Sequence, residues 1–158
     1  MRLTDLLTPE RVAIQHNTPT APLDKARAIH VLAKVLTVGT AVDQVQVERV
    51  LTEREQLQST GIGEGVAIPH GALSQLVTQY ATLLIVPEGV DFAAIDGLAA
   101  NILFAVIGPK RATGEHLKTL ARVSRLLRNK GFRDRLIAAP NASAAYELIA
   151  VEEGGDRR

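Results

Sequence analysis

The sequence predicts an α/β protein with a mixed central sheet of about five strands and helices on both faces. Two apolar runs, Ala81 to Val86 and Ile102 to Ile107, lack the alternation of a half-exposed strand, so we expect both to be strands covered on two sides. Segments with helical spacing of apolar residues lie before and after these runs. That order is typical of a sheet enclosed between two helical layers.

Two helices are predicted before the strands. Apolar residues recur with helical spacing over 23–36, and Asp43 is the expected N-cap of a second helix. We expect the apolar face of that helix to include Val47, Val50, Leu51 and Leu57. Arg54 follows Val47 by seven residues and falls on the same inward face, where a charge needs a partner or a bound anion.

A glycine-rich loop follows the second predicted helix. A glycine-rich stretch at 59–65 leads into a short apolar strand at 66–68 and then into a Pro-His-Gly turn at 69–71. Residues 90–93 are expected to add a short edge strand.

Three further helices are expected after the last apolar run. Thr113 is the expected cap of the first, which ends near Asn129 and places Leu117, Leu120, Val123 and Leu127 on one side. A shorter helix follows at 132–138, and Ser143 is the expected cap of the last, which ends near Val151. We therefore predict a single domain over 1–151 and a flexible tail over 152–158.

Composition limits the possible functions. The chain has 18 Lys and Arg against 17 Asp and Glu, with two Tyr and three Phe, so it has neither the basic patch nor the aromatic content of a nucleic-acid-binding protein. It has no Cys, which excludes disulfides, thiolate metal sites and Cys nucleophiles. No apolar run approaches the roughly 18 residues that span a bilayer, so we expect a cytoplasmic protein without direct membrane insertion.

His70 is the strongest candidate among four histidines. The glycines around it, Gly61, Gly63, Gly65 and Gly71, let main chain approach an anion, and Ser59 and Thr60 offer hydroxyl groups. A neutral imidazole can attack phosphorus with one nitrogen while an acceptor holds the proton on the other. The sequence identifies neither that acceptor nor the attacking nitrogen, and a plain strand-to-turn histidine is the alternative.

Two further side chains are expected to converge on His70. His116 lies in the first turn of its predicted helix, in line with Leu120, and Arg54 points inward from another helix. Ion pairs of Arg54 with Glu55 or Glu64, or of His116 with Glu115, are the alternatives. His16 and His30 lack such surroundings and are expected to be structural.

Other site chemistries lack their motifs. The glycine stretch has neither the lysine of a nucleotide-binding P-loop nor the spacing of a dinucleotide fingerprint. No metal-binding histidine pair and no Gly-x-Ser-x-Gly elbow occurs. We expect no cofactor and no metal.

The stretch from Thr52 to Gly71 closely resembles the phosphorylation-site region of enzyme IIA of the fructose/mannitol class, from the bacterial phosphoenolpyruvate-dependent phosphotransferase system. Residues 92–97, 101–107 and 115–120 resemble later segments of that family. The resemblance implies that His70 is phosphorylated, that Arg54 and His116 are active-site residues, and that a histidine-containing phosphocarrier protein is the donor. It also implies a stoichiometric phosphohistidine carrier with no cofactor.

The resemblance leaves the use of the phosphate open. The free-standing form and the segment Ala94-Ile95-Asp96-Gly97 look most like the nitrogen-regulatory branch, in which phosphorylation state controls target proteins of nitrogen, carbon or potassium metabolism. A sugar-specific subunit that passes phosphate to an enzyme IIB is one alternative. An unphosphorylated interaction module is another.

Overall fold

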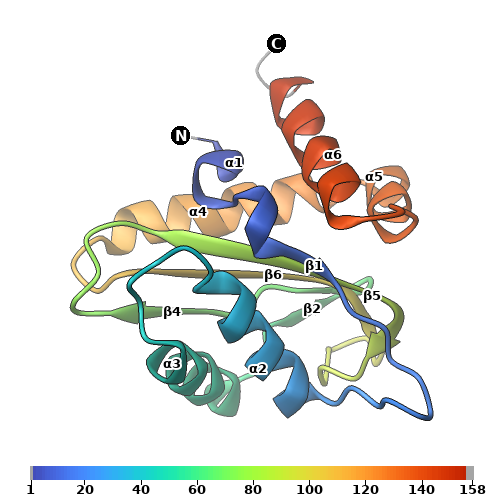
Figure 1. Cartoon of the computed structure of the whole chain (residues 1–158), viewed down its shortest axis with the longest axis horizontal. Coiled ribbons are helices and arrows are strands. Elements are labelled where there is room, and N and C mark those ends of the chain that lie inside the picture. The colour runs from blue at the N-terminus through green and yellow to red at the C-terminus, as the bar shows by residue number, and fades with distance from the viewer. Residues whose placement is uncertain (1, 156–158) are drawn as a thin grey trace.

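The structure is a computed structural model, and it describes residues 2–155 (Figure 1). One mixed sheet holds six strands, one more than expected: β1 (Val12–Ile14), β2 (Gly61–Gly63), β3 (Val66–Ala67), β4 (His70–Leu73), β5 (Tyr80–Val90) and β6 (Ala100–Pro109). The helices are α1 (Leu3–Leu6), the 3₁₀ turn η1 (Pro9–Arg11), α2 (Lys25–Leu36), α3 (Gln44–Leu57), α4 (Thr113–Leu126), α5 (Lys130–Ile137) and α6 (Ala142–Gly155).

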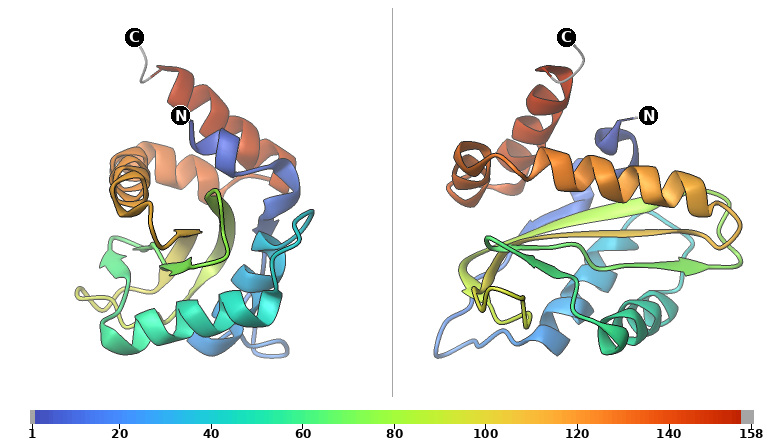
Figure 2. Two further views of the ribbon diagram at one scale, coloured as in Figure 1. Left: turned by 90° about the vertical axis from the view of Figure 1, so that its left-hand side faces the viewer. Right: turned by 180° about the vertical axis from the view of Figure 1, so that it is seen from behind.

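Helices cover both faces of the sheet, which confirms the predicted fold class. Helices α2 and α3 lie on one face, and α1, α4, α5 and α6 lie on the other (Figures 1 and 2). Each face has its own apolar core, with Leu32, Leu51 and Leu103 on the α2–α3 side and Phe104, Val123 and Phe132 on the other. A site that draws side chains from both layers must therefore lie at an edge of the sheet.

The two long apolar runs form the centre of the sheet. Strands β5 and β6 pair antiparallel, with Tyr80 opposite Ile107 and Leu84 opposite Leu103. Both are buried on two faces, as their lack of alternation predicted. Strand β5 continues through Pro87 to Val90, so the separate edge strand expected at 90–93 is wrong. Strand β1, too short to give a sequence signal, pairs parallel with β5.

Strands β3 and β4 run in succession along the same edge of β6. Val66 pairs with Ile102 and His70 with Val106, both parallel, and Ile68 and Pro69 interrupt the strand between them. His70 therefore begins a strand, where the sequence suggested the middle of a turn.

The glycine-rich stretch folds as a hairpin between β2 and β3. Its turn residues Glu64 and Gly65 have φ of 57° and 80°, and Gly63 has φ of 96°, a region that favours glycine. These glycines thus meet the needs of a tight hairpin.

The predicted caps are only partly correct. Asp43 accepts a hydrogen bond from the backbone N–H of Val45, as expected of an N-cap. Thr113 is instead the first residue of α4, and Asn141 replaces Ser143 as the side chain that accepts from the first turn of α6. Leu57 and Leu117, expected on inward faces, are 83% and 60% exposed because they lie outside the buried stripes of α3 and α4.

The C-terminal helix extends further than predicted. Helix α6 continues to Gly155, and the carboxylate of Glu153, 1% exposed, accepts hydrogen bonds from the backbone N–H groups of Leu3 (2.7 Å) and Thr4 (3.1 Å). The flexible tail expected from 152 is therefore wrong for 152–155, and 156–158 lie outside the described residues. No helix in the described part of the chain is long and apolar enough to cross a membrane.

Candidate functional site

His70 lies in an open cleft of about 260 Å³ at the sheet edge. Arg54 of α3, Gln58 directly after that helix and Leu120 of α4 line it together with His70, so the cleft draws on both helical layers. Ser59, Thr60, Ile62 and Ile68 complete its walls.

The ring of His70 is oriented by main chain. Its Nδ1 lies 2.8 Å from the carbonyl oxygen of Ile68, within the interruption between β3 and β4. A carbonyl only accepts, so Nδ1 carries the proton and donates it. The neutral ring then has its lone pair on Nε2, which makes Nε2 the nucleophilic nitrogen. This hydrogen bond supplies the acceptor that the sequence did not identify.

The electrostatics of the cleft favour neutral His70. Burial lowers the pKa of His70 below its usual 6.5, and the nearby Arg54 guanidinium lowers it further. The Ile68 carbonyl and the Glu55 carboxylate oppose this shift in the pKa but do not reverse it. His70 is therefore an uncharged imidazole at neutral pH.

His116 lies next to His70, as the sequence predicted. The centroids of the two rings are 5.7 Å apart and their planes are inclined by 52°. Burial, and after it the neighbouring His70, lowers the pKa of His116. Its Nδ1 is buried and makes no hydrogen bond.

Arg54 is half-buried at the C-terminal end of α3 and donates from Nη1 to the carbonyl oxygen of Gln58 at 2.8 Å. This contact holds the guanidinium in the wall of the cleft. The ion pairs considered for Arg54 do not form, because Glu55 pairs with Lys25 and Glu64 with Arg133.

Glu55 is a buried residue that the sequence interpretation missed. It is 8% exposed, and its Oε1 accepts from the backbone N–H of Thr60 at 3.0 Å and from the Thr60 hydroxyl. Its Oε2 lies 2.7 Å from Lys25 Nζ. Glu55 follows Val47 and Leu51 at four-residue intervals on the buried stripe of α3, and this spacing could have identified it.

Four loop residues were expected to support a phosphoryl group, namely Ser59, Thr60, Gly61 and Gly71, and only the first two line the cleft. Ser59 and Thr60 line the cleft, but the Thr60 hydroxyl is bonded to Glu55 and the Ser59 hydroxyl donates to the carbonyl of Phe92. Gly61 packs against Ala94.

Gly71 faces the opposite side of the sheet from His70, where a β-carbon would collide with Val50 of α3. The lack of a side chain at Gly71 thus makes room for the packing of α3 against β4.

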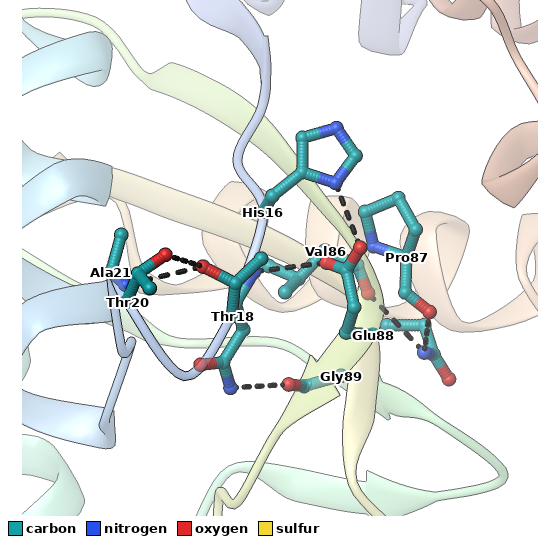
Figure 3. A network of polar contacts seen from close by, with 10 residues as sticks. His16, Thr18, Thr20, Ala21, Val86, Pro87, Glu88 and Gly89 are labelled. Atoms are coloured by element: carbon teal, nitrogen blue, oxygen red, sulfur yellow. Dashed lines mark hydrogen bonds and ion pairs between the residues drawn. The ribbon is translucent and has the colours of Figure 1, made fainter.

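His16 and His30 lie outside the cleft. The Nδ1 of His16 is 2.8 Å from a carboxylate oxygen of Glu88 near the far end of β5 (Figure 3), and His30 is paired with Glu48 at 2.7 Å. The Asn17 backbone N–H, followed by His16, lowers the pKa of Glu88. Among residues 2–155, no group of three or more acidic, His or Cys side chains is arranged to hold a metal ion.

Comparison with known proteins gives a consistent assignment. The family model of the phosphoenolpyruvate-dependent sugar phosphotransferase system, EIIA 2, matches residues 6–151. The nitrogen regulatory protein of Bradyrhizobium diazoefficiens is 35% identical over 96% of each chain. That of Pseudomonas aeruginosa is 34% identical over 98% of this chain and 99% of its own.

The crystal structure of nitrogen regulatory protein IIA-Ntr from Neisseria meningitidis superposes with a TM-score of 0.82 at 26% identity, covering 93% of this chain and 98% of that one. The sequence and the fold agree on this assignment. The chain belongs to the EIIA 2 family and is a IIA-type component of the phosphoenolpyruvate-dependent sugar phosphotransferase system.

Proposed function

We propose that this protein accepts a phosphoryl group on Nε2 of His70 from a histidine-containing phosphocarrier protein, and that a target protein reads the phosphorylation state. The observation that carries the proposal is the 2.8 Å contact between His70 Nδ1 and the Ile68 carbonyl. It leaves a neutral, half-buried Nε2 as a nucleophile beside a guanidinium.

The transfer balances without a cofactor. The N–P bond of the donor phosphohistidine breaks as the Nε2–P bond of His70 forms, and the proton of His70 stays on Nδ1, hydrogen-bonded to the Ile68 carbonyl. One phosphoramidate replaces another, so the step is close to energetic balance. The charge of the phosphoryl oxygens has to be compensated while they pass between the two rings.

Arg54 and His116 are placed to provide that compensation. Arg54 is the cation in the wall of the cleft, and its planar fork suits two phosphoryl oxygens. His116 lies on the other side, with its ring centroid 5.7 Å from that of His70. Donors that are already in position when charge develops contribute most to such steps.

The regulatory role is favoured over sugar transport by the relatives. Two proteins named nitrogen regulatory protein align over nearly the whole of both chains, at 35% and 34% identity. We therefore propose that the phosphate on His70 is a signal to a target in nitrogen, carbon or potassium metabolism. Transfer to an enzyme IIB of a sugar system is the second candidate.

Phosphorylation can be tested directly. The protein is incubated with phosphoenolpyruvate, enzyme I and the carrier protein, and an acid-labile gain of one phosphoryl group is sought by mass spectrometry. We expect the gain in the wild type and in His16→Ala, the matched surface histidine, and none in His70→Ala. An unmodified wild type, or a His70→Ala variant that gains as much, would exclude phosphorylation of His70.

The use of the phosphate needs a second experiment. Phosphorylated protein is mixed with an enzyme IIB of the fructose or mannitol type, and the lifetime of the phosphohistidine is followed. The regulatory proposal predicts a lifetime unchanged by enzyme IIB. Rapid transfer to enzyme IIB would support the sugar-specific role instead.

A further inference from the structure

Two buried polar atoms beside the cleft have no hydrogen-bond partner. One is Nδ1 of His116, and the other is Oε1 of Gln79, a residue that is 7% exposed and directly precedes β5. A buried polar group without a partner is costly, so each of these atoms requires an explanation.

The two atoms belong to side chains that meet over the same glycine. A β-carbon on Gly108 would lie 3.1 Å from Cγ of Gln79 and 3.4 Å from Nδ1 of His116. Tyr80 pairs with Ile107 in the antiparallel ladder of β5 and β6, which brings Gln79 opposite Gly108. The missing side chain at Gly108 is what gives both groups room on the α4 face of the sheet.

The two groups are chemically complementary in one protonation state. An amide oxygen only accepts, and Nδ1 of an imidazolium only donates. The neutral, half-buried His116 of the unphosphorylated protein gives Gln79 no obligatory donor. A protonated His116 would supply one, and its other nitrogen, Nε2, would then also carry a proton.

We propose that Gln79 is the positioning residue of His116, an inference that rests on the proposed function. The Oε1 of Gln79 accepts a hydrogen bond from Nδ1–H of the cationic His116 ring. The ring then presents Nε2–H to the phosphoryl group on His70. The dianionic phosphoryl group attracts the additional proton, which comes from solvent, and no covalent bond of His116 or Gln79 changes.

Burial opposes this protonation in the absence of phosphate, which is the direction in which the pKa of His116 is shifted. The titratable and charged groups around His116 are His70 on β4, with Arg54 and Glu55 of α3 beyond it, and Glu115 and Lys118 on α4 itself. None of them needs to be altered to test Gln79.

The test is an NMR titration of the His116 imidazole in the full, unphosphorylated chain. Gln79→Met keeps length and volume but removes the acceptor, so we expect the protonated fraction of His116 on the acid side to fall about tenfold, the value of one hydrogen bond to a charged group. Gln79→Glu supplies a stronger acceptor, so the protonated fraction should rise. Gln75→Met, at the exposed glutamine four residues earlier, should titrate as wild type.

The opposite signs of the Met and Glu variants separate positioning from a structural role, because a packing defect would not raise the protonation of His116. Wild-type titration in both variants, with their thermal unfolding unchanged, would overturn the proposal. If either variant fails to fold, the other still decides by the sign of its shift.

A second measurement distinguishes this proposal from the proposed function. On phosphorylation of His70 the wild type should protonate His116 at higher pH than before, and Gln79→Met should weaken this response. A wild type that takes up no phosphate would refute the proposed function while the titration still tests the contact. A phosphorylated protein in which Gln79→Met responds as wild type would refute the role of Gln79 alone.

Discussion

Glu153 and Glu55 are both buried carboxylates, yet they belong to regions of opposite character. Glu153 binds the first backbone N–H groups of α1 and lies 3.8 Å from Arg122 of α4, so it connects the two ends of the chain. Glu55 holds the loop at Thr60, but its Oε2 has only the Lys25 contact.

The difference extends to the surroundings of the two carboxylates. Among residues 2–155, four buried side-chain atoms lack a hydrogen bond. Three of them lie at or beside the His70 cleft and belong to Glu55, Gln79 and His116. The fourth belongs to Arg2. The contacts of Glu153 connect α6 to α1, whereas Gln79 and His116 each keep a buried atom without a hydrogen bond. Substitutions in the two regions should therefore separate stability from activity.

The largest expected effect is on stability, in Glu153→Ala. This change leaves the N–H groups of Leu3 and Thr4 without their acceptor and should lower the free energy of unfolding by about 3 kcal/mol. Urea denaturation measures it, while phosphoryl acceptance at 25 °C should stay unchanged. Glu152→Ala, which removes a surface ion pair with Arg135, is the control and should cost less than about 1 kcal/mol. Equal losses in the two variants would contradict the proposed importance of Glu153.

Arg54→Ala should produce the reverse pattern. Removing the cation from the cleft should slow phosphoryl transfer to His70 about a hundredfold, the usual cost of one preorganised charge donor. The urea midpoint should change little, because Arg54 is only half-buried and makes one hydrogen bond. Rapid-quench kinetics with phosphorylated carrier measures the rate, and Arg49→Ala, exposed on the same helix, is the control. An undiminished rate in Arg54→Ala would remove this arginine from the mechanism.

Glu55→Gln should have a smaller effect on both properties. The amide still provides an acceptor for Thr60 but leaves the Lys25 ammonium without its charge partner, so we expect a loss of about 2 kcal/mol in the free energy of unfolding. Transfer to His70 should slow several-fold as the loop at Ser59 and Thr60 loosens. Loss of stability with a wild-type transfer rate would show that Glu55 has no part in shaping the cleft.

The smallest effects concern pH. Because burial lowers the pKa of His70, Nε2 takes up a proton at lower pH than a free imidazole does, and acceptance of phosphate should decline only when the pH falls through the lowered pKa. The unfolded chain protonates His70 and His116 near 6.5, before the native chain does, so the free energy of unfolding should decrease as the pH falls below that value.

Rates measured from pH 8 to pH 5, together with urea denaturation over the same range, check both pH effects. A rate that declines already between pH 7.5 and 6.5 would show that His70 is not shielded from protonation. A free energy of unfolding that stays level below 6.5 in the wild type would contradict the burial effect on both rings.

The sequence predicted the large features of the fold because they depend on local patterns. The unbroken apolar runs gave β5 and β6, and helical spacing gave α2 to α6. The positions of Leu57 and Leu117 were wrong because composition alone does not identify which of several apolar positions faces the sheet. Strand β1 has three residues, and its pairing with β5 depends on contacts about 70 residues away.

The site was predictable to the extent that its residues carry distinctive chemistry. The sequence predicted that His70, Arg54 and His116 lie near one another. In the structure Arg54 and His70 line one cleft, and the His116 ring lies 5.7 Å from that of His70. Gln79 gave no signal, because a glutamine before a strand is ordinary until its burial is known. The acceptor of His70 could not be predicted either, since it is a main-chain oxygen set free by a break between two strands.

The break between β3 and β4 affects how substitutions can change the site. The Ile68 carbonyl that accepts the hydrogen bond from His70 Nδ1 belongs to the main chain. Replacing the side chain of residue 68 therefore does not remove the acceptor. The corresponding contact proposed for His116 depends on the side chain of Gln79, so one codon is enough to lose it. Of the two histidines, the proposed phosphate acceptor His70 therefore has the hydrogen-bond partner that is less exposed to mutation.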